Sequence, residues 1–137
     1  MERLAIALAV AALALLIAWM LQRRRRPPVA GPRLTVPERV DRADFRGARA
    51  PWLLAVFTNH DCETCGAVWD RVQGLGGGTI DTREVRYEID PDLYERYGVD
   101  ACPLVILVDT DGVVRASHHG PVTLAELERS LEEVGAR

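Results

Sequence analysis

The sequence predicts an α/β domain with a central mixed β-sheet flanked by helices, preceded by one N-terminal transmembrane helix. Two short apolar runs, residues 53–57 and 104–108, are typical of strands that are buried on both faces of a sheet. Segments with the apolar spacing of helices lie between and after the predicted strands, which gives the order β-α-β-α-β-β-α. Ahead of them lies an uncharged apolar run over residues 4–21.

This N-terminal run has the length and the flanks of a membrane anchor. Its eighteen residues would rise about 27 Å as a helix, close to the roughly 30 Å hydrocarbon core of a bilayer. A cleavable signal peptide would need a basic start and a small-residue cleavage site, whereas this run leads into four arginines at positions 23–26. We therefore predict an anchor over residues 1–26 and a stiff proline-containing linker over residues 27–34.

The charge distribution indicates where the domain lies and which partners it excludes. Because the four arginines at positions 23–26 outweigh the lone Arg3, the positive-inside rule predicts a single-pass protein of the cell membrane with its soluble domain on the cytoplasmic face. From Pro27 onward the chain has 12 arginines and 19 acidic residues, a net charge of about −7. A surface this acidic repels phosphate backbones, so nucleic acid is not expected as a partner.

The first half of the domain, which spans residues 35–137, is predicted as a β-α-β unit. The run 53–57 is its first strand, and apolar residues at helical spacing follow until glycines 74 and 76–78 end the helix. Residues 83–89 alternate in polarity and predict a second strand, which the helical crossover makes parallel to the first.

The second half is predicted as a short helix, a hairpin and a C-terminal helix. The short helix starts at an Asp-Pro pair and ends at a glycine, within residues 90–98. Strands over residues 104–108 and 113–117 flank a turn rich in aspartate and glycine, as in a hairpin. Thr123 and Glu126 form a capping box that starts the last helix.

Two cysteines spaced by two residues, Cys62 and Cys65, lie where the first helix is expected to begin. Unpaired N–H groups and the helix dipole favour a thiolate at this place, so Cys62 is predicted as the nucleophile. Cys65, one turn in and more buried, is predicted as the thiol that resolves a mixed disulfide. Asp61 is the expected N-cap of this helix. A Cys-x-x-Cys pair is also half of a zinc site, but its place after a buried strand favours redox chemistry.

The element order and the Cys62–Cys65 pair, together with the Cys102-Pro103 dipeptide and Gly120, resemble the thioredoxin family from about residue 35 to the C-terminus. The resemblance implies a thioredoxin-like fold, thiol–disulfide oxidoreductase activity and a cis peptide bond before Pro103, beside the dithiol. It also implies protein thiols and disulfides as substrates, an unidentified electron donor and no cofactor. The substrate-binding residues that it implies are Cys102, Pro103 and Gly120.

The chain departs from the family pattern around the dithiol. Family members usually have an aromatic residue before the first cysteine, Gly-Pro between the cysteines and a buried acid in the preceding strand. This chain has Asp61, Glu63-Thr64 and Val56 at those places. Negative charge from Asp61 and Glu63 should disfavour the Cys62 thiolate and make the disulfide harder to reduce, which predicts a reducing couple.

Accessory roles and alternatives follow from the remaining residues. Without an acid at position 56, His60 and Glu63 are the candidates to take the proton of Cys65. Cys102 is either a small apolar packing residue or a third thiol, which with His60, Cys62 and Cys65 would complete a metal site. The alternatives to an enzyme are therefore a metal or iron–sulfur binding module that uses the three thiols, and an adaptor of the same fold without redox turnover.

Overall fold

The computed structural model describes Met1, residues 12–17 and residues 35–137, and the chain divides into two units at Gly31 and Pro32. Residues 12–17 are helical. Within the described ranges, no helix has both the length and the hydropathy needed to cross a bilayer. Most of the predicted span over residues 4–21, and all of the basic block and the linker over residues 23–34, lie outside the described residues.

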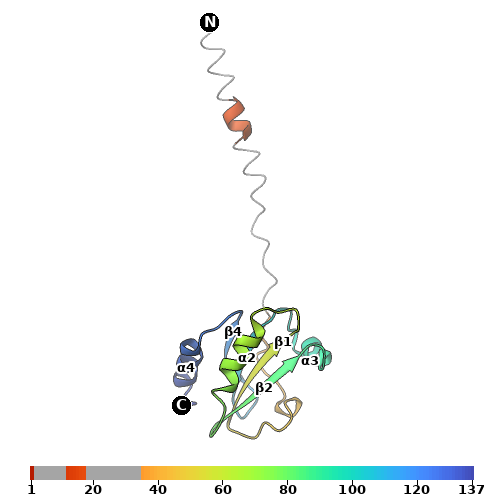
Figure 1. Cartoon of the computed structure of the whole chain (residues 1–137), viewed down its shortest axis with the longest axis vertical. Helices are drawn as coiled ribbons and strands as arrows, with labels where there is room; N and C mark the ends of the chain where they lie inside the picture. Colours follow the sequence, from red (N-terminus) through yellow and green to blue (C-terminus); the bar gives the residue numbers. More distant parts are fainter. Residues whose placement is uncertain (2–11, 18–34) are drawn as a thin grey trace. The chain divides into compact units, whose positions relative to one another are not determined.

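The second unit is built on a four-stranded mixed sheet in the order β2-β1-β3-β4 (Figure 1). Strand β1 (Trp52–Thr58) runs parallel to β2 (Ile80–Arg86), as a helical crossover requires. On its other side β1 pairs antiparallel with β3 (Leu104–Val108), which forms a hairpin with β4 (Val114–His119). The predicted mixed sheet with a β-α-β unit followed by a hairpin is thus confirmed.

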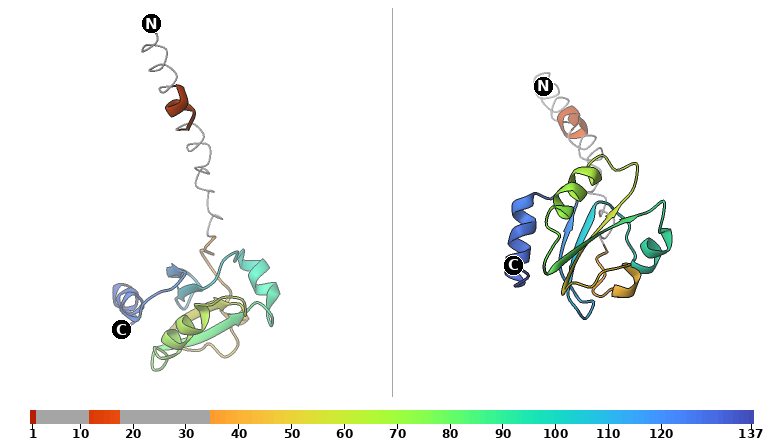
Figure 2. Two further views of the ribbon diagram at one scale, coloured as in Figure 1. Left: turned by 45° about the horizontal axis from the view of Figure 1, so that its top comes forward. Right: turned by 60° about the horizontal axis from the view of Figure 1, so that its bottom comes forward.

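Helices cover both faces of this sheet (Figure 2). Helices α2 (Cys65–Gln73) and α4 (Leu124–Glu133) pack on one face. The 3-10 helix η1 (Arg42–Asp44) and helix α3 (Pro91–Tyr97) lie on the other. Because the two central strands are covered on both sides, β1 and β3 are buried almost throughout, as their continuous apolar runs predicted.

Alternate residues of β1 divide between two apolar cores. Leu54 and Val56 face the α2 and α4 side, whereas Leu53, Ala55 and Phe57 face the η1 and α3 side. The first core, on the α2 side, also contains Val68, Val72, Leu75, Ile80, Val105, Leu107, Val122, Leu127, Leu131 and Ala136. The second core also contains Val40, Phe45, Val85, Tyr94, Val99, Leu104, Ile106 and Val108.

The predicted helix signals of the second half are confirmed. At the start of α4 the Thr123 side chain accepts a hydrogen bond from the Glu126 backbone, and the Glu126 carboxylate accepts one in return. Helix α3 begins with Pro91 at its first position and ends at Gly98, whose φ of 62° is left-handed.

Strand β2 lies three residues earlier than predicted, over Ile80–Arg86 instead of residues 83–89. Pairing stops where β1 ends, because Arg86 is the partner of Thr58, the last residue of β1. The chain then turns, and the apolar side chains of Tyr87 and Ile89 are 52% and 60% exposed. Strand β4 is likewise shifted, to Val114–His119 from the predicted 113–117.

Candidate active site

Cys62 and Cys65 form a disulfide, with their Cα atoms 5.5 Å apart. Cys65 is the first residue of α2 and is 3% exposed. Cys62 lies in the turn before the helix and is partly exposed; its N–H donates to the carbonyl of Asn59 at 3.4 Å. The predicted contrast between an accessible first cysteine and a buried second one is therefore present.

The start of α2 differs from the prediction. The helix begins at Cys65 and not at Cys62, and its N-cap is Thr64, whose side chain makes no capping hydrogen bond. The prediction that Asp61 caps the helix is wrong. The Asp61 carboxylate instead contacts the imidazole of His60, with Oδ1 2.9 Å from Nε2. The turn over residues 59–64 thus places Cys62 just ahead of the helix terminus.

The peptide bond between Cys102 and Pro103 is cis, as the family resemblance implied. Leu104 pairs with Phe57, so the start of β3 lies beside the end of β1 from which the dithiol turn emerges. Gly120 is held at the same place, because its N–H donates to the Pro103 carbonyl at 2.8 Å.

An open groove of about 480 Å³ brings the dithiol turn and the segment before the cis bond together. Three of the side chains that line it are acidic and exposed, namely Asp61, Glu63 and Asp100, and none of the lining residues is basic. The other lining residues are Asn59, Cys62, Thr64, Ala101 and Cys102. A substrate that reaches Cys62 therefore meets negative charge on both sides of the groove.

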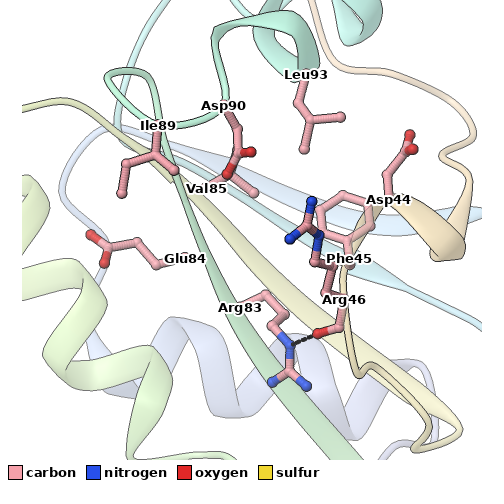
Figure 3. Close-up of a pocket in the computed structure, with 9 residues that line it drawn as sticks. All are labelled: Asp44, Phe45, Arg46, Arg83, Glu84, Val85, Ile89, Asp90 and Leu93. Atoms are coloured by element: carbon pink, nitrogen blue, oxygen red, sulfur yellow. Dashed lines mark hydrogen bonds between the residues drawn. The ribbon is translucent and has the colours of Figure 1, made fainter.

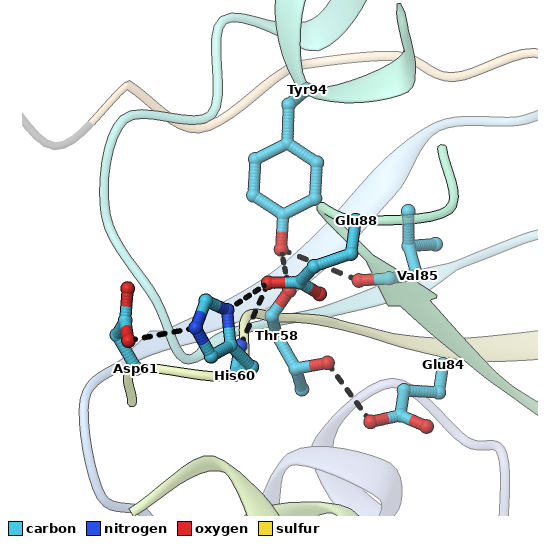
Figure 4. A network of polar contacts seen from close by, with 7 residues as sticks. All are labelled: Thr58, His60, Asp61, Glu84, Val85, Glu88 and Tyr94. Carbon is cyan, nitrogen blue, oxygen red and sulfur yellow. Dashed lines mark hydrogen bonds and ion pairs between the residues drawn. The ribbon is translucent and has the colours of Figure 1, made fainter. Parts of the chain in front are cut away.

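His60 is held between two carboxylates (Figure 4). Its Nδ1 lies 3.0 Å from Oε1 of Glu88, which also accepts the His60 backbone N–H at 2.8 Å. The hydrogen bond to Glu88, with the charge of Asp61, raises the pKa of His60 above its ordinary value. The same contacts, led by the backbone hydrogen bond, lower the pKa of Glu88 to about 2. Both effects favour a charged pair between His60 and Glu88.

A second carboxylate, Glu84, lies on the opposite side of the β1 end. The hydroxyl of Thr58 donates to its Oε1 at 2.9 Å (Figure 4). Arg86 Nε lies 3.7 Å from its Oε2. Glu84 pairs with Val56, the position at which the family has its buried acid. The sequence analysis missed both Glu84 and Glu88. The parallel pairing of β1 with β2 was predicted, but only the register identifies the residue next to Val56.

Cys102 is a free thiol that lies near Tyr94. Burial, and next the charge of Glu88, raise the pKa of the Cys102 thiol, which therefore stays protonated near neutral pH. Burial likewise raises the pKa of Tyr94, whose hydroxyl donates to the carbonyls of Thr58 and of Val85. These contacts favour a packing role for Cys102 over that of an additional nucleophile.

The four-residue metal-ligand set that was left open as an alternative is not assembled in the described residues. Within the part of the chain that the structure describes, no group of three or more His, Cys, Asp and Glu side chains is placed to hold a metal ion. His60 has both ring nitrogens in contact with carboxylates, and the sulfurs of Cys62 and Cys65 are bonded to each other. The structure brings together the redox pair, and does not bring together the four-residue site.

A separate cavity of about 380 Å³ opens beside β2 (Figure 3). Phe45 and Leu93 border it from the η1 and α3 side. Arg83, which also borders it, donates from Nε to the Arg46 carbonyl at 2.8 Å. The Glu84 carboxylate points away from Phe45 in this view. The remaining residues at its border are Asp44, Val85, Ile89 and Asp90. No cysteine borders it, so it is not part of the dithiol site.

Comparison with solved structures identifies the fold. A mutant thioredoxin from Halobacterium salinarum NRC-1 superposes with a TM-score of 0.55 at 21% identity, covering 61% of this chain and 74% of that one. A malarial protein of known structure superposes with a TM-score of 0.54 at 19% identity, covering 60% of this chain and 94% of that one. Neither protein-family models nor curated proteins give a match. The chain therefore has a thioredoxin-like fold, and its paired cysteines fit a redox function.

Proposed function

We propose that this chain is a membrane-tethered thiol–disulfide oxidoreductase that reduces disulfides in partner proteins. The observation that carries the proposal is the disulfide between a partly exposed Cys62, which lines an open groove, and a Cys65 that is 3% exposed. Exchange needs this asymmetry, because one sulfur must meet the substrate while the other waits, shielded, to release it.

In the reduced protein, the Cys62 thiolate attacks one sulfur of a substrate disulfide, and the other substrate sulfur leaves as a thiolate. Cys65 then attacks the Cys62 sulfur, which frees the reduced substrate and leaves the Cys62–Cys65 disulfide. An electron donor returns the pair to the dithiol. We place the substrate segment along Cys102, Pro103 and Gly120, because the partly exposed Cys102 lines the groove next to the cis bond and an extended chain can pair there.

The direction that we propose is reduction. Asp61, Glu63 and Asp100 surround the mouth of the groove that contains Cys62, and their charges disfavour the Cys62 thiolate. A less stable thiolate makes the dithiol form a stronger electron donor. Equilibration with glutathione buffers measures this directly. We expect a reducing potential, and a value as oxidising as that of a disulfide-forming enzyme would refute the direction.

Membrane attachment is proposed from the N-terminal residues. The run 4–21 has no charged side chain, and in the described helical residues 12–17 Leu13, Leu15, Leu16 and Ile17 are each at least half exposed. Exposed apolar side chains on a helix are suited to lipid contact. Resistance of the membrane-bound protein to alkaline extraction would support the anchor, and a topology reporter fused after Arg137 would test the cytoplasmic orientation.

Trapping tests the chemistry. In the Cys65→Ser variant the mixed disulfide on Cys62 cannot be resolved, so partner proteins should accumulate in covalent complexes that dithiothreitol releases. The matched control is the double variant Cys62→Ser with Cys65→Ser, which should trap nothing. A third variant, Cys65→Ser with Cys102→Ser, should trap as much as Cys65→Ser. Equal trapping by the double variant would contradict the assignment of Cys62.

A further inference from the structure

Cys65 must lose a proton before it can attack, and its surroundings keep water away. A thiol is a poor nucleophile compared with its thiolate, so resolution of the mixed disulfide needs an acceptor for the Cys65 proton. With 3% of its surface exposed, Cys65 has little access to solvent bases. The acceptor must therefore be sought among the side chains beneath α2.

We propose that Glu84 accepts the proton of Cys65 as that thiol attacks Cys62, a role that rests on the proposed function. Glu84 lies on the face of the sheet that α2 covers. Its strand partner Val56 belongs to the core that contains Val68 and Val72 of α2, and paired residues of neighbouring strands point to the same face. Side chains alternate along β2, so Arg86 points to the same face as Glu84, whereas Val85 faces the second core.

The carboxylate of Glu84 is held in place at the end of β1 from which the dithiol turn departs. Thr58, which is buried, donates from its hydroxyl to Oε1 at 2.9 Å (Figure 4). Arg86 Nε lies 3.7 Å from Oε2. The Glu84 side chain is 24% exposed, so it is shielded but can still pass a proton on to solvent. A proton acceptor needs both a fixed position and a route by which the proton can reach solvent.

The other ionisable groups of this region are less suited. His60 is 73% exposed, and its ring already contacts the carboxylates of Glu88 and Asp61, which raise its pKa. Glu88 has its pKa lowered to about 2, so it binds a proton weakly. Asp61 and Glu63 lie exposed in the groove with Cys62.

Asp70 of α2 and His118 of β4 already have other hydrogen-bond partners. Asp70 of α2 accepts a hydrogen bond from Gln73 at 3.1 Å. His118 of β4 contacts Ser130 at 2.8 Å, and burial lowers its pKa. Cys102, on the other side of the dithiol turn, has its pKa raised by burial and so holds its own proton.

The step balances without an added reactant. Cys65 gives its proton to the Glu84 carboxylate, its sulfur forms a bond to the Cys62 sulfur, and the bond between Cys62 and the substrate sulfur breaks. The bonding electrons leave with the substrate thiolate, which takes up a proton from Glu84 or from water. The dithiol is oxidised by two electrons, the substrate disulfide is reduced by two, and Glu84 returns to its charged form.

The test separates the two sulfur steps in time. The reduced full chain in detergent reacts with an aromatic disulfide, and the released thiolate is followed by stopped-flow absorbance. The first phase is attack by Cys62 and the second is resolution by Cys65. We expect Glu84→Gln to slow the second phase at least about tenfold near neutral pH, because general-base catalysis contributes ~10²–10⁴-fold. The first phase should stay within about twofold of wild type, since solvent can accept the proton of the partly exposed Cys62.

If Glu84 acted only through its negative charge, Glu84→Gln would change the rate of the second phase in the opposite direction. Removing a carboxylate near Cys65 would favour its thiolate, so the second phase would become faster. A proton acceptor predicts a slower second phase whose rate rises steeply with pH, as hydroxide replaces the lost base. Glu84→Asp, which keeps the carboxylate, should recover part of the rate. Glu132→Gln, which removes an exposed carboxylate from α4, is the matched control and should leave both phases unchanged.

A second variant guards against loss of the fold. Thr58→Val removes the hydroxyl that positions Glu84 and should give a smaller slowing of the second phase, which Thr58→Ser should not. If wild type shows no second phase, both the proposed function and this inference fail. If wild type resolves normally and Glu84→Gln keeps its rate and pH profile, or becomes faster, the inference alone is refuted.

Discussion

The two ends of the central strands are built differently. At one end, Asp109 closes the hairpin: its Oδ1 accepts the N–H groups of Asp111 and Val113, each at 2.9 Å, and its Oδ2 accepts Arg115 Nε at 2.6 Å. At the other end, which carries the dithiol turn, Asn59 Oδ1 is buried and has no hydrogen-bond partner among the described residues. Both carboxylate oxygens of Asp109 accept hydrogen bonds, whereas the side-chain oxygen of Asn59 accepts none from the described residues.

This difference indicates that one end of the sheet contributes mainly to stability and the other to reactivity. A buried carboxylate with three hydrogen-bond donors stabilises its turn, whereas a buried acceptor without one costs about 1–3 kcal/mol. Asn59 lies in the turn that presents Cys62 to the groove. We therefore expect substitutions at the Asp109 end to change the free energy of unfolding, and substitutions at the dithiol end to change reactivity.

The largest expected effect is on activity. Cys62→Ser should reduce the rate of protein disulfide reduction to background, because no accessible sulfur remains to start the exchange. The free energy of unfolding of reduced Cys62→Ser should match that of the reduced wild type, measured by urea denaturation. Asp109→Asn is the counterpart at the other end and should retain the specific activity of the folded fraction. Residual turnover in Cys62→Ser would assign the nucleophile elsewhere.

Two glycines, one near each end, give a matched pair for stability. Gly112 and Gly120 both have left-handed φ values, 78° and 74°. A Cβ at Gly112 would lie 2.2 Å from the Val40 carbonyl oxygen, whereas a Cβ at Gly120 would meet nothing within 4 Å. We expect Gly112→Ala to lower the free energy of unfolding by about 2–5 kcal/mol, from left-handed strain plus overpacking, and Gly120→Ala by about 1–2 kcal/mol. Equal losses in chemical denaturation would show that the contact with Val40 relaxes.

The hydrogen bonds of Asp109 predict a smaller loss with a pH signature. Asp109→Ala should cost about 1–3 kcal/mol, since two backbone N–H groups and Arg115 lose their acceptor. Burial opposes ionisation of Asp109, but the hydrogen bonds from Val113, Arg115 and Asp111 outweigh it and lower its pKa below 3.8. This contribution is therefore fully present above about pH 3.8 and disappears as the pH falls through the lower folded pKa.

Acid denaturation of wild type and Asp109→Asn measures that contribution. The difference between their unfolding free energies should be constant above about pH 4 and shrink below it. A difference that stays constant down to about pH 2 would mean that Asp109 has an ordinary pKa.

The smallest expected effect concerns the exposed pair at the dithiol end. Contact with Glu88 and Asp61 raises the pKa of His60 above 6.5, so their stabilising contribution is present below that pH and is lost as the pH rises through the folded pKa. NMR titration of the His60 ring should give the raised value, and Glu88→Gln should bring it back towards 6.5. Asp92→Asn, on α3, should leave it unchanged.

The fold was predictable because its signals are local. Buried strands show as apolar runs, and Thr123 with Glu126 or Gly98 mark helix ends by their own chemistry. The position of β2 could not be predicted. Tyr87 and Ile89 continue the alternation of polar and apolar residues beyond Arg86, where the pairing with β1 has ended.

The cysteines of the candidate site could be predicted from the sequence, whereas the carboxylates of Glu84 and Glu88 could not. A cysteine spacing and a Cys-Pro dipeptide are visible in the chain itself. The place of Glu84 beside Val56 depends on the pairing of two strands 28 positions apart in the β1–β2 register. The contact of Glu88 with His60 depends on how two turns meet in space.

The position of β2 at one edge of the sheet has a consequence for solubility. An edge strand with free N–H and C=O groups invites pairing with another chain and hence aggregation. Four of the seven residues of β2 are charged: Asp81, Arg83, Glu84 and Arg86. Asp81 also binds the N–H groups of Arg49 and Ala50, which places another segment along the start of the strand. These charges and the bound segment protect the edge from self-association, on the same strand that supplies the carboxylate of Glu84 to Thr58.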